Sequence, residues 1–181
     1  MDARDLLAES VLSTKLLLAR YLAGFDESSR TRQAAGLPNH VAWNLGHCAL
    51  TMHRIANLFA SDPPTMAGPL PERDFIVGDG TKGDGARFDS ESVSFASQPM
   101  DEPGRYPSLV RAAAIYDAAC ERLAAVIRAT PESKLSQMVS WGSGAQVPLW
   151  SVGTRMVFHN GFHTGQIADL RRALGFKSIF S

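Results

Sequence analysis

Residues 154–176 read TRMVFHNGFHTGQIADLRRALGF, and this stretch decides the predicted fold and the predicted site together. We predict that it belongs to a helix over about 148–174, which Gly175 ends. His159 and His163 are four residues apart in this helix. They therefore lie on one helix face, one turn apart, where two imidazoles can bind the same metal ion.

Three further helices are predicted upstream, over about 2–23, 39–59 and 107–129, from apolar residues that recur at steps of three and four. Asn39 is a candidate cap for the second helix, and prolines delimit the second and third helices. Four amphipathic helices in a single domain, residues 1–181, predict an all-α fold, a four-helix bundle.

The connection between the second and third helices, about 61–107, shows no sustained helical period. Its stretch GDGTKGDGARF lacks the spacing of a phosphate-binding loop and the final Glu of a calcium loop. An irregular crossover of this length is either disordered or functional. It leaves both an up-down-down-up and a simple antiparallel topology open. The later piece SQMVSWGSGAQVPLW is predicted to be a short hairpin or an irregular turn.

The composition excludes several classes of partner. Lys+Arg and Asp+Glu both number 18, so the net charge is zero and nothing favours nucleic acid or an anionic membrane. No stretch reaches the ~18 apolar residues of a membrane span, and MDARDLLAES does not resemble a signal peptide. Cys48 and Cys120 lie in helical patterns and are predicted to be buried and unpaired. We therefore expect a cytoplasmic protein.

The histidine pair alone is weak evidence for a metal site, because paired surface histidines are common. Two observations strengthen it. An apolar wall beside the pair predicts that part of this helix is buried; it consists of Val152, Met156, Phe158 and Phe162. In addition, His47 lies in WNLGHCAL, among positions that mark a buried helix face. A buried histidine needs partners for both ring nitrogens.

A divalent metal ion shared by His47, His159 and His163 would meet that need. Three protein ligands leave positions open for water or substrate, which is typical of catalytic rather than structural sites. HNGFH lacks the Glu of HExxH, so no general base is supplied within the motif. The alternative is that these histidines pack in the core without metal.

Other residues are candidates for roles near this site. His40 is an alternative residue at its mouth, and His53 is predicted to lie on the surface. Gln166, one turn from His163, is a polar neighbour, and no carboxylate that would orient the histidines is evident. The remaining candidates are Glu9, Asp117 and Glu121 as orienting carboxylates, by helix membership alone; Trp43 and Trp150 as pocket or core residues; Gly161 and Gly165 as points of close helix approach; and Arg171 and Arg172 as a solvated helix end.

WNLGH on the second helix, together with FHNGFHTGQIADLRRALG on the last, resembles the DinB-like superfamily, also called the DinB/YfiT-like metalloenzymes. The resemblance covers most of the chain, and HNGFHTGQI is its most specific part. It implies an up-down-down-up four-helix bundle, often homodimeric. It also implies a divalent ion, often zinc or nickel, on a histidine triad that corresponds to His47, His159 and His163.

Relatives in this family include S-transferases that use bacillithiol or mycothiol, and a mycothiol-dependent maleylpyruvate isomerase. The resemblance therefore implies a metal-dependent enzyme that acts on a small-molecule substrate, either a transferase that activates a low-molecular-weight thiol or a hydrolase. The alternative is a stress-response protein that binds the metal without catalysis. A third hypothesis is a structural bundle with no metal.

Overall fold

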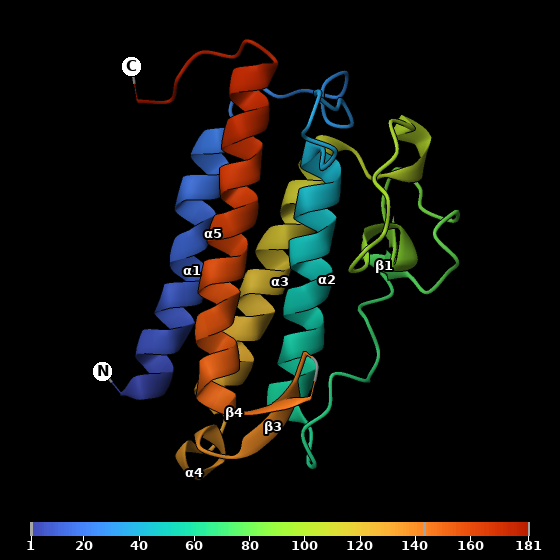
Figure 1. The fold of residues 1–181 in the computed structure, drawn as a ribbon. Coiled ribbons are helices and arrows are strands. Elements are labelled where there is room, and N and C mark those ends of the chain that lie inside the picture. Colours follow the sequence, from blue (N-terminus) through green and yellow to red (C-terminus); the bar gives the residue numbers. More distant parts are fainter. Residues whose placement is uncertain (1, 143, 181) are drawn as a thin grey trace.

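Four long helices pack side by side in the computed structural model, which describes residues 2–142 and 144–180 (Figure 1). They are α1 (Ala3–Leu22), α2 (Val41–Ala60), α3 (Leu109–Ala129) and α5 (Leu149–Ala173). α1 contacts α3 and α5, and α2 contacts the same two helices. The predicted all-α class is confirmed in that the protein is mainly helical, with small sheets added.

The helices begin and end at residues that satisfy their free backbone groups. Asp2 caps α1, and its carboxylate accepts hydrogen bonds from two amides of the first turn. The cap of α2 is His40, whose ring accepts from the Trp43 amide, rather than the predicted Asn39. Asn39 stands one position too early for that role. Gly175 follows α5 with a φ of 79°, which agrees with the predicted stop.

Apolar side chains fill the space between the helices, at most of the periodic positions predicted for them; Leu6 and Leu16 of α1 are exposed. α2 is buried along most of its length, because it packs against α3, α5 and the segment that follows it. Cys48 and Cys120 are buried and unpaired, as predicted. The largest fully buried side chains are Tyr106, Tyr116, Phe59, Phe88, Leu45, Leu50, Met52, Ile55, Ile115, Leu123, Ile127 and Leu149.

The predicted apolar wall of α5 is only half buried. Val152 and Met156 are in the core, but Phe158 and Phe162 are 77% and 55% exposed. Successive residues of a helix are about 100° apart, so the two phenylalanines point well away from the other two side chains. The prediction that part of this helix is buried is therefore confirmed, and the buried part is the face of Val152 and Met156.

The crossover, residues 61–108, is folded onto the outside of α2 (Figure 1). β1 (Phe75–Ile76) pairs in parallel with β2 (Phe88–Asp89). Two short 3₁₀ helices follow, η1 (Glu91–Val93) and η2 (Pro103–Arg105). η1 contacts α2 directly, so its backbone lies beside the residues of that helix.

Buried Asp89 organises the Gly- and Asp-rich part of the crossover. Its Oδ2 accepts hydrogen bonds from the amides of Gly80 (2.9 Å) and Lys82 (3.0 Å), and its Oδ1 accepts from Glu91 (2.9 Å). A Cβ at Gly78 would lie 2.2 Å from Asp89 Oδ2, so the loop can wrap this carboxylate only with glycine there. The glycines therefore serve the packing of the crossover.

A short helix and a hairpin connect α3 to α5. α4 (Glu132–Leu135) is followed by β3 (Met138–Trp141) and β4 (Ala145–Pro148), which pair antiparallel. Of the two predicted alternatives, the hairpin is confirmed. β4 leads directly into α5, so the hairpin lies beside the first turns of the helix that carries two of the histidines (Figure 1).

No helix in the described part of the chain combines the length and the apolar character needed to cross a bilayer.

Candidate metal centre

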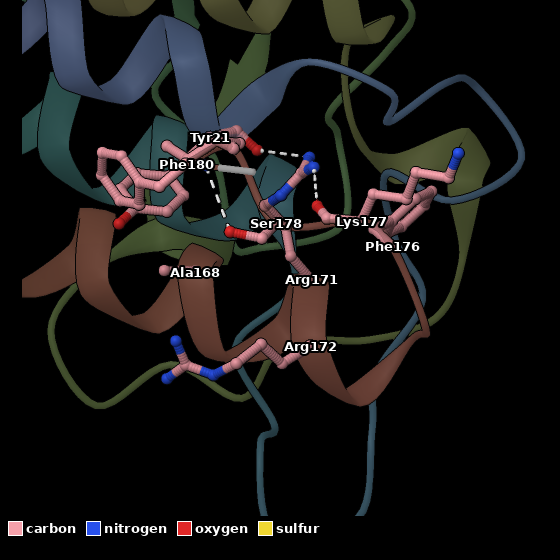
Figure 2. Close-up of a pocket in the computed structure, with 9 residues that line it drawn as sticks. Tyr21, Ala168, Arg171, Arg172, Phe176, Lys177, Ser178 and Phe180 are labelled. Atoms are coloured by element: carbon pink, nitrogen blue, oxygen red, sulfur yellow. Dashed lines mark hydrogen bonds between the residues drawn. The ribbon is translucent and has the colours of Figure 1, made fainter.

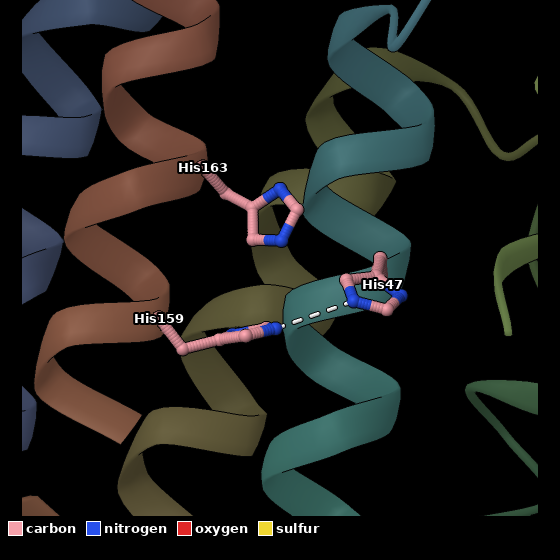
Figure 3. A group of neighbouring side chains, drawn as sticks. All are labelled: His47, His159 and His163. Atoms are coloured by element: carbon pink, nitrogen blue, oxygen red, sulfur yellow. Dashed lines mark hydrogen bonds between the residues drawn. The ribbon is translucent and has the colours of Figure 1, made fainter. Parts of the chain in front are cut away.

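The structure brings together the three histidines named from the sequence. His47 points from α2 toward His159 and His163 on α5 (Figure 3). Nε2 of His47 and Nε2 of His159 are 3.2 Å apart, and one ligand atom from each of the three rings lies within 4.8 Å of the others. His47 and His163 are buried, and His159 is partly exposed.

The orientation of His47 is set by the crossover. Its Nδ1–H donates to the Val93 carbonyl of η1 at 2.9 Å, and the Trp43 indole stacks on its other side at 4.6 Å and 6°. η1 comes this close because residue 46 has no side chain: a Cβ at Gly46 would lie 2.8 Å from Val93 Cγ1 and 2.7 Å from the Phe88 ring. Since Nδ1 carries the proton, Nε2 of His47 presents its lone pair.

Two amide oxygens orient His163. Its Nδ1–H donates to Asn44 Oδ1 at 2.7 Å and to Gln166 Oε1 at 3.0 Å. The Asn44 amide group cannot be reversed, because its Nδ2 donates to the carbonyls of Asn39 and His40. Asn39 Nδ2 likewise donates to Gln166 Oε1. His163 therefore also presents an unprotonated Nε2.

His159 is held less fully. Its Nδ1 is buried and has no hydrogen-bond partner among residues 2–142 and 144–180. A pocket of about 210 Å³ opens beside this ring, between α2, α5 and β3. Another molecule can therefore approach the triad from the side of His159.

Burial keeps all three rings neutral at pH 7. It lowers the pKa of His47, and it lowers those of His159 to about 4 and His163 to about 3, with a further contribution from neighbouring histidines in the last two. Metal ions bind neutral imidazole. Neighbouring nitrogens around tetrahedral zinc are about 3.3 Å apart, close to the His47–His159 separation. The residues therefore fit a divalent ion.

The other two histidines lie outside this group. His40 is fully buried at the start of α2 and donates from Nε2 to the Met100 carbonyl, so it does not line a site mouth. His53 is buried, not on the surface as predicted. Its ring packs edge-on against Phe75, and Arg122 donates to its Nδ1, because the crossover and α3 cover that side of α2.

The other residues considered near the site differ in whether they contact the triad. The three carboxylates suggested for orienting the histidines instead form surface ion pairs with Lys15 and Arg128. Gln166 does contact the triad, as predicted. Trp43 lines the site, whereas Trp150 is 49% exposed beside α1.

The two glycines of the histidine motif do not mark a close helix contact. No atom lies within 4 Å of a Cβ built at Gly161 or Gly165, because both face outward. The close approach on α5 is instead at Gly153, where a Cβ would lie 2.6 Å from Leu7 of α1.

Arg171 was expected to be solvated, but it is buried at the end of α5 (Figure 2). Its guanidinium donates to the carbonyls of Tyr21, Ala23 and Lys177, and it lies over the Phe176 ring at 5.5 Å. The adjoining pocket of about 140 Å³ is formed by the C-terminal residues that this arginine holds.

Asn44 and Val93 were missed by sequence reasoning. Asn44 gave a usable signal, because it is a polar residue three positions before His47 on a helix predicted to be buried. Val93 gave none, since it acts through its backbone carbonyl.

The sequence of this chain matches a known protein family. The profile of the DinB superfamily matches residues 13–167, which contain all three histidines. Among solved structures, the crystal structure of a conserved protein from Enterococcus faecalis is similar, with a TM-score of 0.68 and 16% identity. The match covers 97% of this chain and 99% of that chain, and at this identity it shows the fold alone. Curated proteins give no match. The chain belongs to the DinB superfamily.

Proposed function

We propose that this protein is a divalent-metal-dependent enzyme, with zinc or nickel held by His47, His159 and His163. The observation that carries the proposal is the convergence of three neutral imidazoles from two helices. Two of them have their Nδ1–H engaged by protein oxygens, so their Nε2 lone pairs are directed inward. Without metal, the Nε2–H tautomer of His159 can donate to Nε2 of His47 at 3.2 Å, and a bound ion would take the place of that proton.

A divalent ion bound here would lower the pKa of a thiol or water bound to it and so supply a nucleophile at neutral pH. The protein's part is orientation. The Val93 carbonyl fixes the His47 ring, and the Asn44 and Gln166 amide oxygens fix the His163 ring; such partners raise the basicity of ligand histidines. The Trp43 indole shields one side of His47 from water.

The pocket beside His159 favours an enzyme over a protein that only binds metal. A site that only stores an ion has no use for an adjacent cavity of about 210 Å³, large enough for a small substrate. We propose a transferase that uses a low-molecular-weight thiol, or a hydrolase. The alternative remains a non-catalytic stress-response protein with the same metal site.

Cobalt(II) substitution tests the thiol form of the proposal. Cobalt-loaded protein should develop a thiolate-to-metal charge-transfer band when a small thiol is added, and His163→Ala should not. A cobalt-loaded parent that shows no such band with cysteine-containing thiols, yet hydrolyses an activated ester, would point to the hydrolase. A cobalt-loaded parent that does neither would support the non-catalytic alternative.

We further propose an up-down-down-up bundle that forms a homodimer. Figure 1 supports this topology, because α1 and α5 run in one direction and α2 and α3 run in the other. An apolar hollow of about 390 Å³ between α1 and α5, flanked by exposed Leu6 and Trp150, supports the dimer. Light scattering should give twice the chain mass, and Leu6→Glu should reduce it to one chain; a monomeric parent would contradict this.

A further inference from the structure

The pocket beside His159 continues directly from the triad toward the hairpin. Thr51 lies one turn after His47 on α2, and Arg155 lies one turn before His159 on α5, so both line the pocket on the faces that carry the histidines. Trp141 of β3 closes the far side. A molecule in this pocket would therefore reach the triad at His159.

The walls of the pocket are mainly apolar and aromatic. Phe158, Phe162 and Trp141 line it, and the two phenylalanines are 77% and 55% exposed. Leaving two phenylalanine rings in water forgoes the stabilisation that their burial would give. A bound molecule with an apolar body would recover part of it. The cavity of about 210 Å³ equals about seven water molecules, so this body is small.

Arg155 is the one positively charged residue among those in the described part of the chain that line the pocket. Its exposed side chain makes no hydrogen bond or ion pair with any residue in 2–142 or 144–180. Other arginines, such as Arg111 and Arg128, are paired with carboxylates. Among the described residues that line the pocket, none is acidic and could neutralise Arg155. A guanidinium offers a planar pair of donors that matches a carboxylate.

We propose that this pocket binds the substrate, a small organic carboxylate with an apolar body, and that Arg155 pairs with the carboxylate. Aromatic walls hold the body of the molecule, and the charge fixes which end faces away from His159. Its role as a substrate site rests on the proposed metal-dependent function. The recognition of the anion does not, because Arg155 and the walls are present without metal.

The test compares benzoate with benzamide, which have the same shape and differ in charge. Binding is followed in metal-free protein through the Trp141 indole N–H resonance, assigned with Trp141→Phe. Benzoate should bind at least about fivefold more tightly than benzamide, as expected for a charge-assisted hydrogen bond. Arg155→Gln should remove that preference. Arg20→Gln, the same change at an exposed position of α1, should keep it.

Equal binding of the two probes, a preference that survives Arg155→Gln, or no shift of Trp141 with either probe would overturn the inference. Repeating the titration with zinc separates the two proposals. Benzoate binding that needs zinc and ignores Arg155 would place the carboxylate on the metal, which overturns this inference and leaves the proposed function standing. A preference for benzoate in a protein that never takes up metal would leave the anion pocket and remove the proposed function.

Discussion

At the scale of single residues, two of the three histidines, His47 and His163, owe their orientation to oxygens that carry no charge. The Val93 carbonyl holds His47, and the Asn44 and Gln166 amides hold His163. The spacing of the histidines predicted which residues would meet, because helical geometry follows from sequence position. The Val93 contact could not be predicted, since a backbone carbonyl 46 residues away leaves no mark in the sequence.

Gln166→Ala should weaken zinc binding about tenfold, because loss of a partner that orients a ligand histidine costs 10–100-fold in affinity and Asn44 remains. Competition with a chromophoric zinc chelator measures the change. The matched control is Gln146→Ala, at an exposed position of β4, which should leave the affinity for zinc unchanged. Equal affinities for the two variants would show that Gln166 has no part in orienting His163.

At the scale of elements, the long helices follow from apolar periodicity and the crossover does not. Residues 61–107 have no period to interpret, because their structure depends on buried Asp89 and on contact with α2. The apolar wall of α5 predicts that part of this helix is buried, but its residues Phe158 and Phe162 are more than half exposed. They line a pocket instead, and sequence alone does not separate these two uses of an aromatic side chain.

Two glycine-to-alanine variants should change stability in opposite directions. Gly46→Ala forces a methyl group against Phe88 and Val93, and overpacking of this kind costs about 1–3 kcal/mol. Gly161→Ala meets no atom within 4 Å and should stabilise α5 by about 0.5–1 kcal/mol. Urea unfolding of both variants measures the free energies. A Gly46→Ala protein as stable as the parent would contradict the close approach of η1 to α2.

At the scale of the whole molecule, four of the five histidines are buried and the fifth, His159, is partly buried. The sequence indicated this for three of them. It failed for His40 and His53 because the crossover covers α2 from outside, and nothing in the local pattern predicts where an irregular segment packs. The ring of helix contacts, in contrast, agrees with four amphipathic helices of similar length.

Burial of these histidines predicts acid sensitivity. It lowers the pKa of His40, His53 and His159 to about 4, below the ordinary value of 6.5. The unfolded chain therefore binds more protons than the folded chain between these values, so stability is full above about pH 6.5 and falls as pH drops toward 4. Each histidine contributes a slope of up to about 1.4 kcal/mol per pH unit.

Urea unfolding of metal-free protein at pH 7.5, 6 and 5 checks this dependence. The unfolding midpoint should fall at each step. A midpoint that stays constant from pH 7.5 to 5 would mean that the histidines are as accessible to protons in the folded chain as in the unfolded one.

Elemental analysis of purified protein, after equilibration with zinc or nickel and removal of free ion, tests the metal centre most directly. The parent and His53→Ala, which removes a buried histidine outside the triad, should each hold about one equivalent per chain. His47→Ala, His159→Ala and His163→Ala should each lose it while keeping the helical circular dichroism of the parent. No metal in the parent, or full occupancy in His163→Ala, would contradict the assignment.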